Sequence, residues 1–100
     1  MVKISEDKII IARKVADFYW RKNNLDDAKT NAEIENLKIQ DFTLTDQDVV
    51  IHTCRPGLLI GRYGENIKNL ENFLGIKVRI LEVDNVNNYM FIYDPMDFLD

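Results

Sequence analysis

Cysteine and histidine are scarce in this sequence, with one residue of each, Cys54 and His52. A single thiol cannot form a disulfide within the chain, which favours a reducing, cytoplasmic location. Long apolar runs are also missing, since no stretch approaches the roughly 18–20 residues that a membrane-spanning helix needs. Residues 1–7 contain acids before any apolar stretch forms, which is not typical of a signal peptide. We therefore expect a cytoplasmic protein without a membrane partner.

The polar residues form no pattern that predicts catalysis. His52 falls within an expected strand, with no Cys, Asp or Glu at the spacing of metal ligands, so a structural role is the more economical interpretation. The carboxylates of residues 26–35 are typical of a solvated loop, and they are Asp26, Asp27, Glu33 and Glu35. We predict a protein that is not an enzyme and has no metal site and no cofactor.

The net charge of −4 is distributed unevenly along the chain. Residues 49–83 hold five cations against three acids, whereas residues 84–100 hold four aspartates and no cation. A local field can oppose the overall one within a Debye length of about 8–10 Å. Residues 49–83 are therefore the candidate segment for an anionic partner, although chance alone also produces so small an excess.

The N-terminal half predicts one helix and leaves a second one open. Apolar residues at helical spacing predict a helix over residues 5–23, with Ser5 as its N-cap. The next residues, 24–35, are polar and poorly patterned. They fit either a loop or one short helix over Ala28–Glu35.

Two strands are expected to follow. Apolar residues alternate over 37–44, with one slip between Ile39 and Phe42, which is typical of a bulged or edge strand. Residues 49–53 form the most β-branched run of the chain and predict a buried strand.

Glycine is also scarce, and two of the four glycines lie three positions apart between two apolar segments. Pro56 suits the first turn of a short helix that ends before Gly61. A longer helix is predicted over Glu65–Leu74, with Gly75 as its C-terminal stop. A tight turn at Gly61 and Gly64 would join the two helices, and the start of the second helix would offer free N–H groups to an anion.

The C-terminal part predicts a strand over residues 76–83, a turn, and a short strand over 89–93 before an acidic tail. The expected fold class is α+β, a three-stranded sheet with helices on one face in the order α-β-β-α-α-β, followed by a short C-terminal strand or tail. We expect one domain over 1–100, divided into the helix at 5–23, a core at 37–83 and an extension at 84–100.

The stretch around the glycines carries a specific motif. In one-letter code it is VIHTCRPGLLIGRYGENI, over residues 50–67. It resembles a KH domain, above all the KH domain of the third protein of the small ribosomal subunit, where an I-H-T-A-R-P-G run leads into V-I-G-x-x-G-x-x-[VI]. The close match covers residues 49–74. Over residues 5–83 the order of elements also resembles the prokaryotic, type II arrangement, in which an extra helix and strand precede the core.

This resemblance implies a module that binds single-stranded RNA, with single-stranded DNA and ribosomal RNA as related partners. In KH domains the G-x-x-G turn clamps the backbone of about four nucleotides. Gly61 and Gly64 would permit the close approach, Arg62 would contact a phosphate, and Tyr63 would stack on a base. The apolar floor under the bases would consist of Leu59, Ile60 and Ile67. The other cations assigned to this interface are Arg55, Lys68 and Arg79, the last depending on which face of the strand it occupies.

Other interpretations remain open at this point. The glycines can simply form turns, although the spacing fits neither a P-loop, since no Lys-Ser/Thr follows, nor a dinucleotide fingerprint. The family turn often carries one or two lysines, whereas this one has Arg62 alone and is followed directly by Glu65. The alternative function is therefore a KH scaffold that acts as a protein–protein interaction module. The oligomeric state is not predicted.

Overall fold

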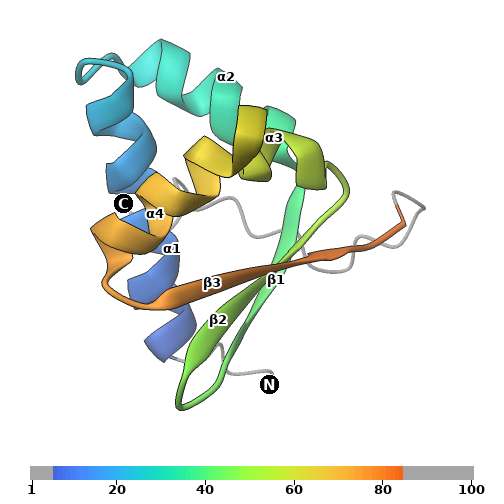
Figure 1. Cartoon of the computed structure of the whole chain (residues 1–100). Coiled ribbons are helices and arrows are strands. Elements are labelled where there is room, and N and C mark those ends of the chain that lie inside the picture. The colour runs from blue at the N-terminus through green and yellow to red at the C-terminus, as the bar shows by residue number, and fades with distance from the viewer. Residues whose placement is uncertain (1–5, 85–100) are drawn as a thin grey trace, which may run out of the picture.

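The structure is a computed structural model that describes residues 6–84 (Figure 1). Ser5, the strand expected at 89–93 and the acidic tail lie outside these residues. The elements in chain order are α1 (Glu6–Lys22), α2 (Asp27–Leu37), β1 (Ile39–Leu44), β2 (Asp48–Thr53), α3 (Pro56–Ile60), the 3-10 turn η1 (Arg62–Gly64), α4 (Glu65–Leu74) and β3 (Lys77–Glu82).

The three strands form one mixed sheet in the order β1-β2-β3. β1 and β2 are antiparallel, whereas β3 lies parallel to β2. Figure 1 shows the helices together on one face of this sheet. Alternate residues of β2 are buried beneath them, namely Val49, Ile51 and Thr53. The architecture confirms the expected α+β class with helices on one face, and it is consistent with a type II-like KH fold.

The polar segment before β1 is a helix, so the structure resolves the alternative that the sequence left open. Asp26 caps α2, because its carboxylate accepts a hydrogen bond of 2.9 Å from the backbone N–H of Lys29. Leu37 belongs to this helix and not to the strand that was predicted to begin there. It lies three residues after Ile34, at helical spacing, and both side chains are buried.

β1 carries the predicted irregularity and lies at the edge of the sheet. Its pairing with β2 shifts between Ile39, which faces Thr53, and Asp41, which faces His52. One additional residue, Gln40, is accommodated at this bulge. The slip in the hydrophobic alternation was therefore a correct indication of both features.

The buried residues form one continuous core among the residues described. α1 contributes Ala12, Val15, Ala16 and Tyr19, and the other members come from α2, α3, α4 and the three strands. α4 begins and ends at the predicted residues, and Gly75 closes it in the left-handed conformation with φ 71°. Because α3 and α4 are both anchored in this core through Leu59 and Leu70, the turn between them has fixed supports.

Candidate nucleic-acid interface

The turn between α3 and α4 reverses the chain within four residues. Gly61 has φ 77° and ψ 174°, Tyr63 has φ 58° and Gly64 has φ 72°. The backbone N–H of Gly64 donates to the carbonyl of Gly61 at 3.1 Å, which closes the turn. Three of the four residues thus have the positive φ that favours glycine.

Gly61 is needed by the protein's own packing. A Cβ atom at this position would lie 2.6 Å from the Cβ of Asn66 and 3.0 Å from its backbone nitrogen. Its φ and ψ also fall in a region that is essentially restricted to glycine. The sequence argument assigned this glycine to the approach of a ligand, whereas the structure shows that the next helix already occupies that space.

Gly64 differs, because no heavy atom lies within 4 Å of the place where its Cβ would be. It is the N-cap residue of α4, and no side chain caps the helix there. The backbone N–H of Glu65 donates to the carbonyl of Arg62, so the N–H groups that follow it in the first turn of α4 are the ones that could face an anion at the positive end of the helix dipole. Glu65, in the first helical turn, is the acidic neighbour that would oppose a phosphate.

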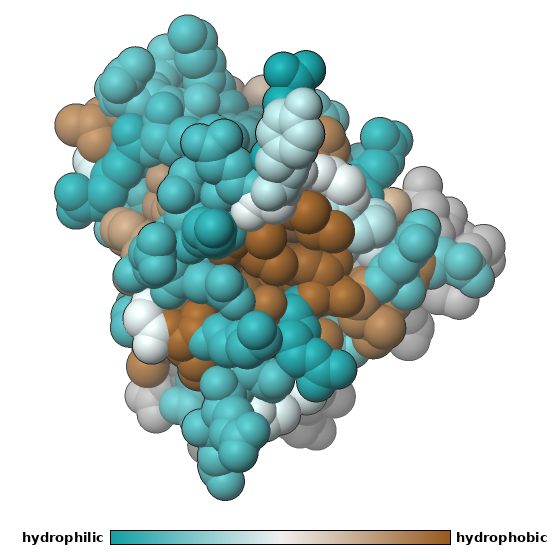
Figure 2. Space-filling view, viewed as in Figure 1, coloured by the Kyte–Doolittle hydropathy of each residue, from teal (hydrophilic) through white to brown (hydrophobic). Residues whose placement is uncertain are grey.

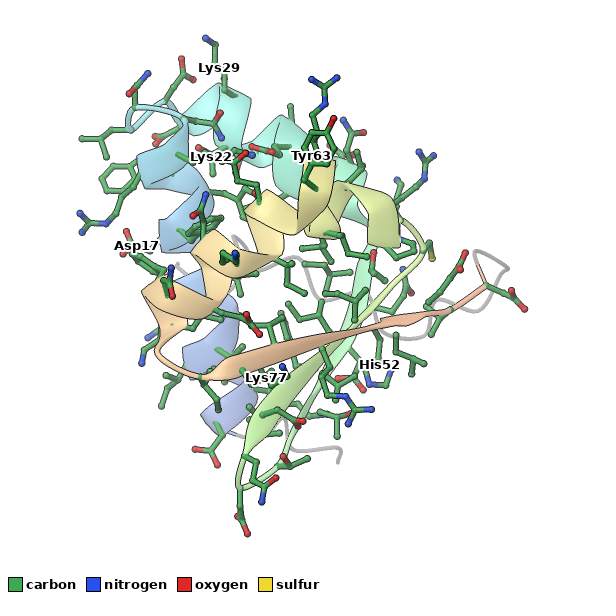
Figure 3. All side chains as sticks on the ribbon, in the orientation of Figure 1. Asp17, Lys22, Lys29, His52, Tyr63 and Lys77 are labelled. Atoms are coloured by element: carbon green, nitrogen blue, oxygen red, sulfur yellow. The ribbon has the colours of Figure 1, made fainter. Side chains whose placement is uncertain are left out.

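The two residues between the glycines face solvent. Tyr63 is 97% exposed, and Figure 3 shows its side chain projecting outward beside the start of α4. Arg62 is also exposed. Within residues 6–84, neither side chain has a hydrogen-bond or ion-pair partner. A guanidinium and an aromatic ring are therefore available together at the tip of the turn.

An apolar surface lies beside the turn, between α4 and β3, where Figure 2 shows hydrophobic residues gathered on this face of the molecule. Ile60 at the end of α3 is 38% exposed, and Ile67 on α4 and Ile80 on β3 are half-buried against the core. Leu59, predicted to be part of this floor, is fully buried and offers no surface to a base. The apolar surface therefore includes Ile80, which the sequence argument did not single out, and excludes Leu59.

β3 is held at a defined distance from α4 along this surface. The carboxylate of Glu71 on α4 accepts a hydrogen bond of 2.9 Å from the backbone N–H of Val78 on β3. That N–H points away from β2. Because the direction of backbone groups alternates along a strand, the N–H of Ile80 points to the same outer edge. Ile80 thus combines an apolar side chain with a backbone donor beside the apolar surface.

The predicted cations are not all brought together. Arg55 before α3 and Lys68 on α4 are exposed and belong to the elements that flank the turn. Arg79 pairs in register with Val50, on the sheet face opposite the helices, and forms an ion pair of 3.6 Å with Asp48. This opposite face also carries His52, whose ring nitrogen lies 2.8 Å from the hydroxyl of Thr43 (Figure 3). Arg79 therefore does not reach the turn.

Two residues that the sequence argument missed, Tyr19 and Asn66, support the turn through hydrogen bonds. The side-chain nitrogen Nδ2 of Asn66 donates to the carbonyl of Leu59 at 2.8 Å and to the hydroxyl of Tyr19 at 2.9 Å. Burial raises the pKa of Tyr19 to about 12, so its hydroxyl stays neutral at physiological pH and remains an acceptor for this bond. The only sequence signal was an asparagine two residues after Gly64, which does not reveal a partner on a distant helix.

Within residues 6–84, no three His, Cys, Asp or Glu side chains are grouped as a metal site would require. Across the same range, no helix is long and apolar enough to cross a membrane.

The fold and the turn define a small α+β domain in which paired glycines join two helices beside a mixed sheet. A family model described as the KH domain matches residues 22–91, more than half of the chain, and the protein belongs to the KH domain family. No curated protein matches the sequence. Membership of this family indicates nucleic-acid binding in general.

Proposed function

We propose that this protein binds single-stranded RNA through the turn at 61–64 and the apolar surface formed by Ile60, Ile67 and Ile80. The observation that carries the proposal is the start of α4 beside Gly64, where no side chain caps the helix, next to exposed Arg62 and Tyr63. The element order and the parallel pairing of β2 with β3 support the finer assignment to the type II KH group, including the resemblance to the ribosomal KH domain.

The phosphate contacts would come from the turn. Gly64 presents no side chain, so a sugar–phosphate backbone can approach the N–H groups at the start of α4. Arg62 adds a mobile positive charge for the same phosphate or its neighbour. Arg55 and Lys68 would extend this positive field along the bound nucleic-acid strand. Exposed phosphate contacts of this kind are weakened by salt, so binding should fall as the ionic strength rises.

The bases would lie on the apolar surface. Splayed bases are commonly packed against apolar or aromatic side chains and read at their edges. Here the floor is aliphatic, the outer edge of β3 offers the N–H of Ile80, and Tyr63 is free to stack on a base at the tip. Stacking on an aromatic side chain is worth about 1–3 kcal/mol per base.

The test is the double substitution Arg62→Asp with Tyr63→Asp, measured against short random-sequence single-stranded RNA. We expect RNA binding to be abolished, because the only charge and the only ring of the tip are removed and two acids are added. The melting temperature should change by less than about 4 °C, since exposed substitutions usually cost within about 0.5 kcal/mol.

The matched control is Lys14→Asp with Gln47→Asp, which changes the net charge by the same amount at exposed positions on α1 and in the β1–β2 hairpin. This control should bind RNA nearly as well as the unchanged protein. If the turn variant binds as well as the control, the turn is not the site. Repeating the titration with DNA of matched sequence shows whether the ribose hydroxyl contributes.

A second candidate function, a protein–protein interaction module on the same scaffold, is favoured by one observation. Glu65 follows the turn directly and opposes the single charge of Arg62, within a chain of net charge −4. This alternative predicts that the unchanged protein does not bind short single strands at low salt. Binding that weakens steadily with added salt excludes it.

A further inference from the structure

The turn has little packed support on one side. A surface hollow of about 560 Å³ lies behind it, lined by residues of the turn, by Lys22 and Glu33, and by Asn66. Open space therefore adjoins the turn on this side. The defined contacts from below are the two hydrogen bonds of Asn66 and the close approach of Gly61 to the Asn66 Cβ.

Tyr19 is a rigid anchor for this arrangement. Its side chain is fully buried, its ring packs edge-on against Phe18 with centroids 5.0 Å apart, and the Lys22 ammonium lies 5.2 Å from the ring centroid. The hydroxyl therefore has one defined position at the end of a fixed ring. Through Asn66 it connects the longest helix of the described residues to the start of α4.

The amide of Asn66 spans the turn. One hydrogen bond joins Asn66, which follows the turn, to the carbonyl of Leu59, which precedes it. One side chain thus links the two ends of the turn, and we call this link the clasp. The bond to Tyr19 fixes the orientation of that amide. Loss of the Tyr19 hydroxyl would leave Asn66 free to rotate, and the clasp on Leu59 would weaken with it.

We propose that Tyr19 and Asn66 are positioning residues, which hold the 61–64 turn in the shape that receives a phosphate without touching the nucleic acid themselves. This inference rests on the proposed RNA-binding function. Apparent affinity falls with the fraction of molecules whose binding site is already in the competent conformation. The clasp would thus set affinity by keeping the turn pre-organised.

The experiment measures two quantities in Tyr19→Phe, which removes only the hydroxyl. Amide hydrogen exchange at Gly61 and Gly64 in the free protein should become faster by about two- to tenfold, the range expected for one hydrogen bond. The Kd for short single-stranded RNA should rise by at least about twofold. Both are measured well below the melting temperature, where every variant is folded.

Two further variants separate positioning from simple destabilisation. Thr30→Val removes a hydroxyl from another fully buried residue, whose hydrogen bond of 2.7 Å stays within the start of α2. It should change neither the exchange at the turn nor the Kd. In an Asn66→Ala background, which keeps the Cβ against Gly61, adding Tyr19→Phe should have no further effect on either quantity.

The proposal is overturned if Tyr19→Phe leaves both quantities unchanged, if Thr30→Val shifts them equally, or if Tyr19→Phe acts undiminished in the Asn66→Ala background. Failure of the unchanged protein to bind RNA would instead overturn the proposed function. The exchange rates at Gly61 and Gly64 would then still decide whether the clasp orders the turn.

Discussion

The two ends of the turn are built differently. At Gly61 the backbone packs so tightly against Asn66 that a side chain would overlap it, at a Cβ–Cβ distance of 2.6 Å. At Gly64 an added Cβ atom would have no heavy atom within 4 Å. The first end packs against Asn66, whose amide is bonded to Tyr19, while the second has open surroundings at the start of α4.

This difference separates two reasons for having glycine in one short motif. The first glycine is required by the fold, with or without a ligand. The second is required by its positive φ, and its open surroundings leave room for a phosphate. Substitution of Gly61 should therefore mainly lower the stability of the fold, whereas substitution of Gly64 should mainly weaken RNA binding.

The largest effect is expected for Gly61→Ala. The substitution forces both a conformation that is essentially restricted to glycine and an overlap with Asn66, so it should lower the free energy of unfolding by about 3 kcal/mol. This corresponds to a fall in melting temperature of about 12 °C or more for a domain of this size. Urea unfolding measures it, and a loss below about 1 kcal/mol would show that α4 moves aside at little cost.

Gly64→Ala should cost less stability but reduce binding. A left-handed φ costs a non-glycine residue roughly 1–2 kcal/mol. Gly75→Ala is the matched control, since Gly75 has φ 71° and equally open surroundings at the other end of α4. We expect similar losses of stability in both variants, but about tenfold weaker RNA binding only for Gly64→Ala, roughly one charge-assisted hydrogen bond. Equal affinities in the two variants would place the phosphate elsewhere.

Arg62→Gln tests the exposed end of the turn against the opposite sheet face. It should weaken RNA binding by about three- to tenfold and reduce the salt slope of log Kd by about 0.7, the loss of one phosphate contact to a single strand. Arg79→Gln removes the same charge from the face where Arg79 pairs with Asp48, and should leave affinity within about twofold. Titrations at several salt concentrations measure both. If Arg79→Gln weakened RNA binding more than Arg62→Gln, the interface would lie on the sheet face opposite the helices.

The smallest effect is expected for Glu65→Gln. Removing this charge should tighten RNA binding by about two- to threefold, because a phosphate at the start of α4 would no longer meet an acid there. The same change should cost about 0.3–0.5 kcal/mol of stability, since an acid in the first turn favours the helix dipole. Parallel binding and unfolding measurements check the opposite signs. Weaker binding would indicate that Glu65 contacts the ligand directly.

Local patterns predicted most of the elements. The bounds of α4 and its glycine stop follow from helical spacing and the left-handed conformation that glycine tolerates. The slip in β1 follows from its broken alternation. α2 could not be distinguished from a loop, because its sequence is polar and only Thr30, Ile34 and Leu37 are buried.

The candidate site was predicted less completely. The turn carries a motif, and it lies between two helices where the sequence predicted it. The burial of Leu59 and the face occupied by Arg79 depend on how α3 and β3 pack. Neighbouring residues of a helix or strand point in different directions, so one can be buried while the next is exposed. The bond between Asn66 and Tyr19 joins residues 47 positions apart, and no local spacing indicates it.

The sequence by itself determined where the chain turns at the paired glycines, that α1, α3 and α4 are helical, and which family the motif resembles, because these properties follow from short-range sterics and periodicity. Only the tertiary structure decided which glycine serves the fold and which is open to a ligand. It also decided which apolar residues form the exposed floor, and which distant side chain supports the turn. These outcomes depend on how α1, α4 and the sheet pack in three dimensions. That packing can bring one residue into contact with a neighbouring element and leave another residue of the same local pattern exposed, as it does at Gly61 and Gly64.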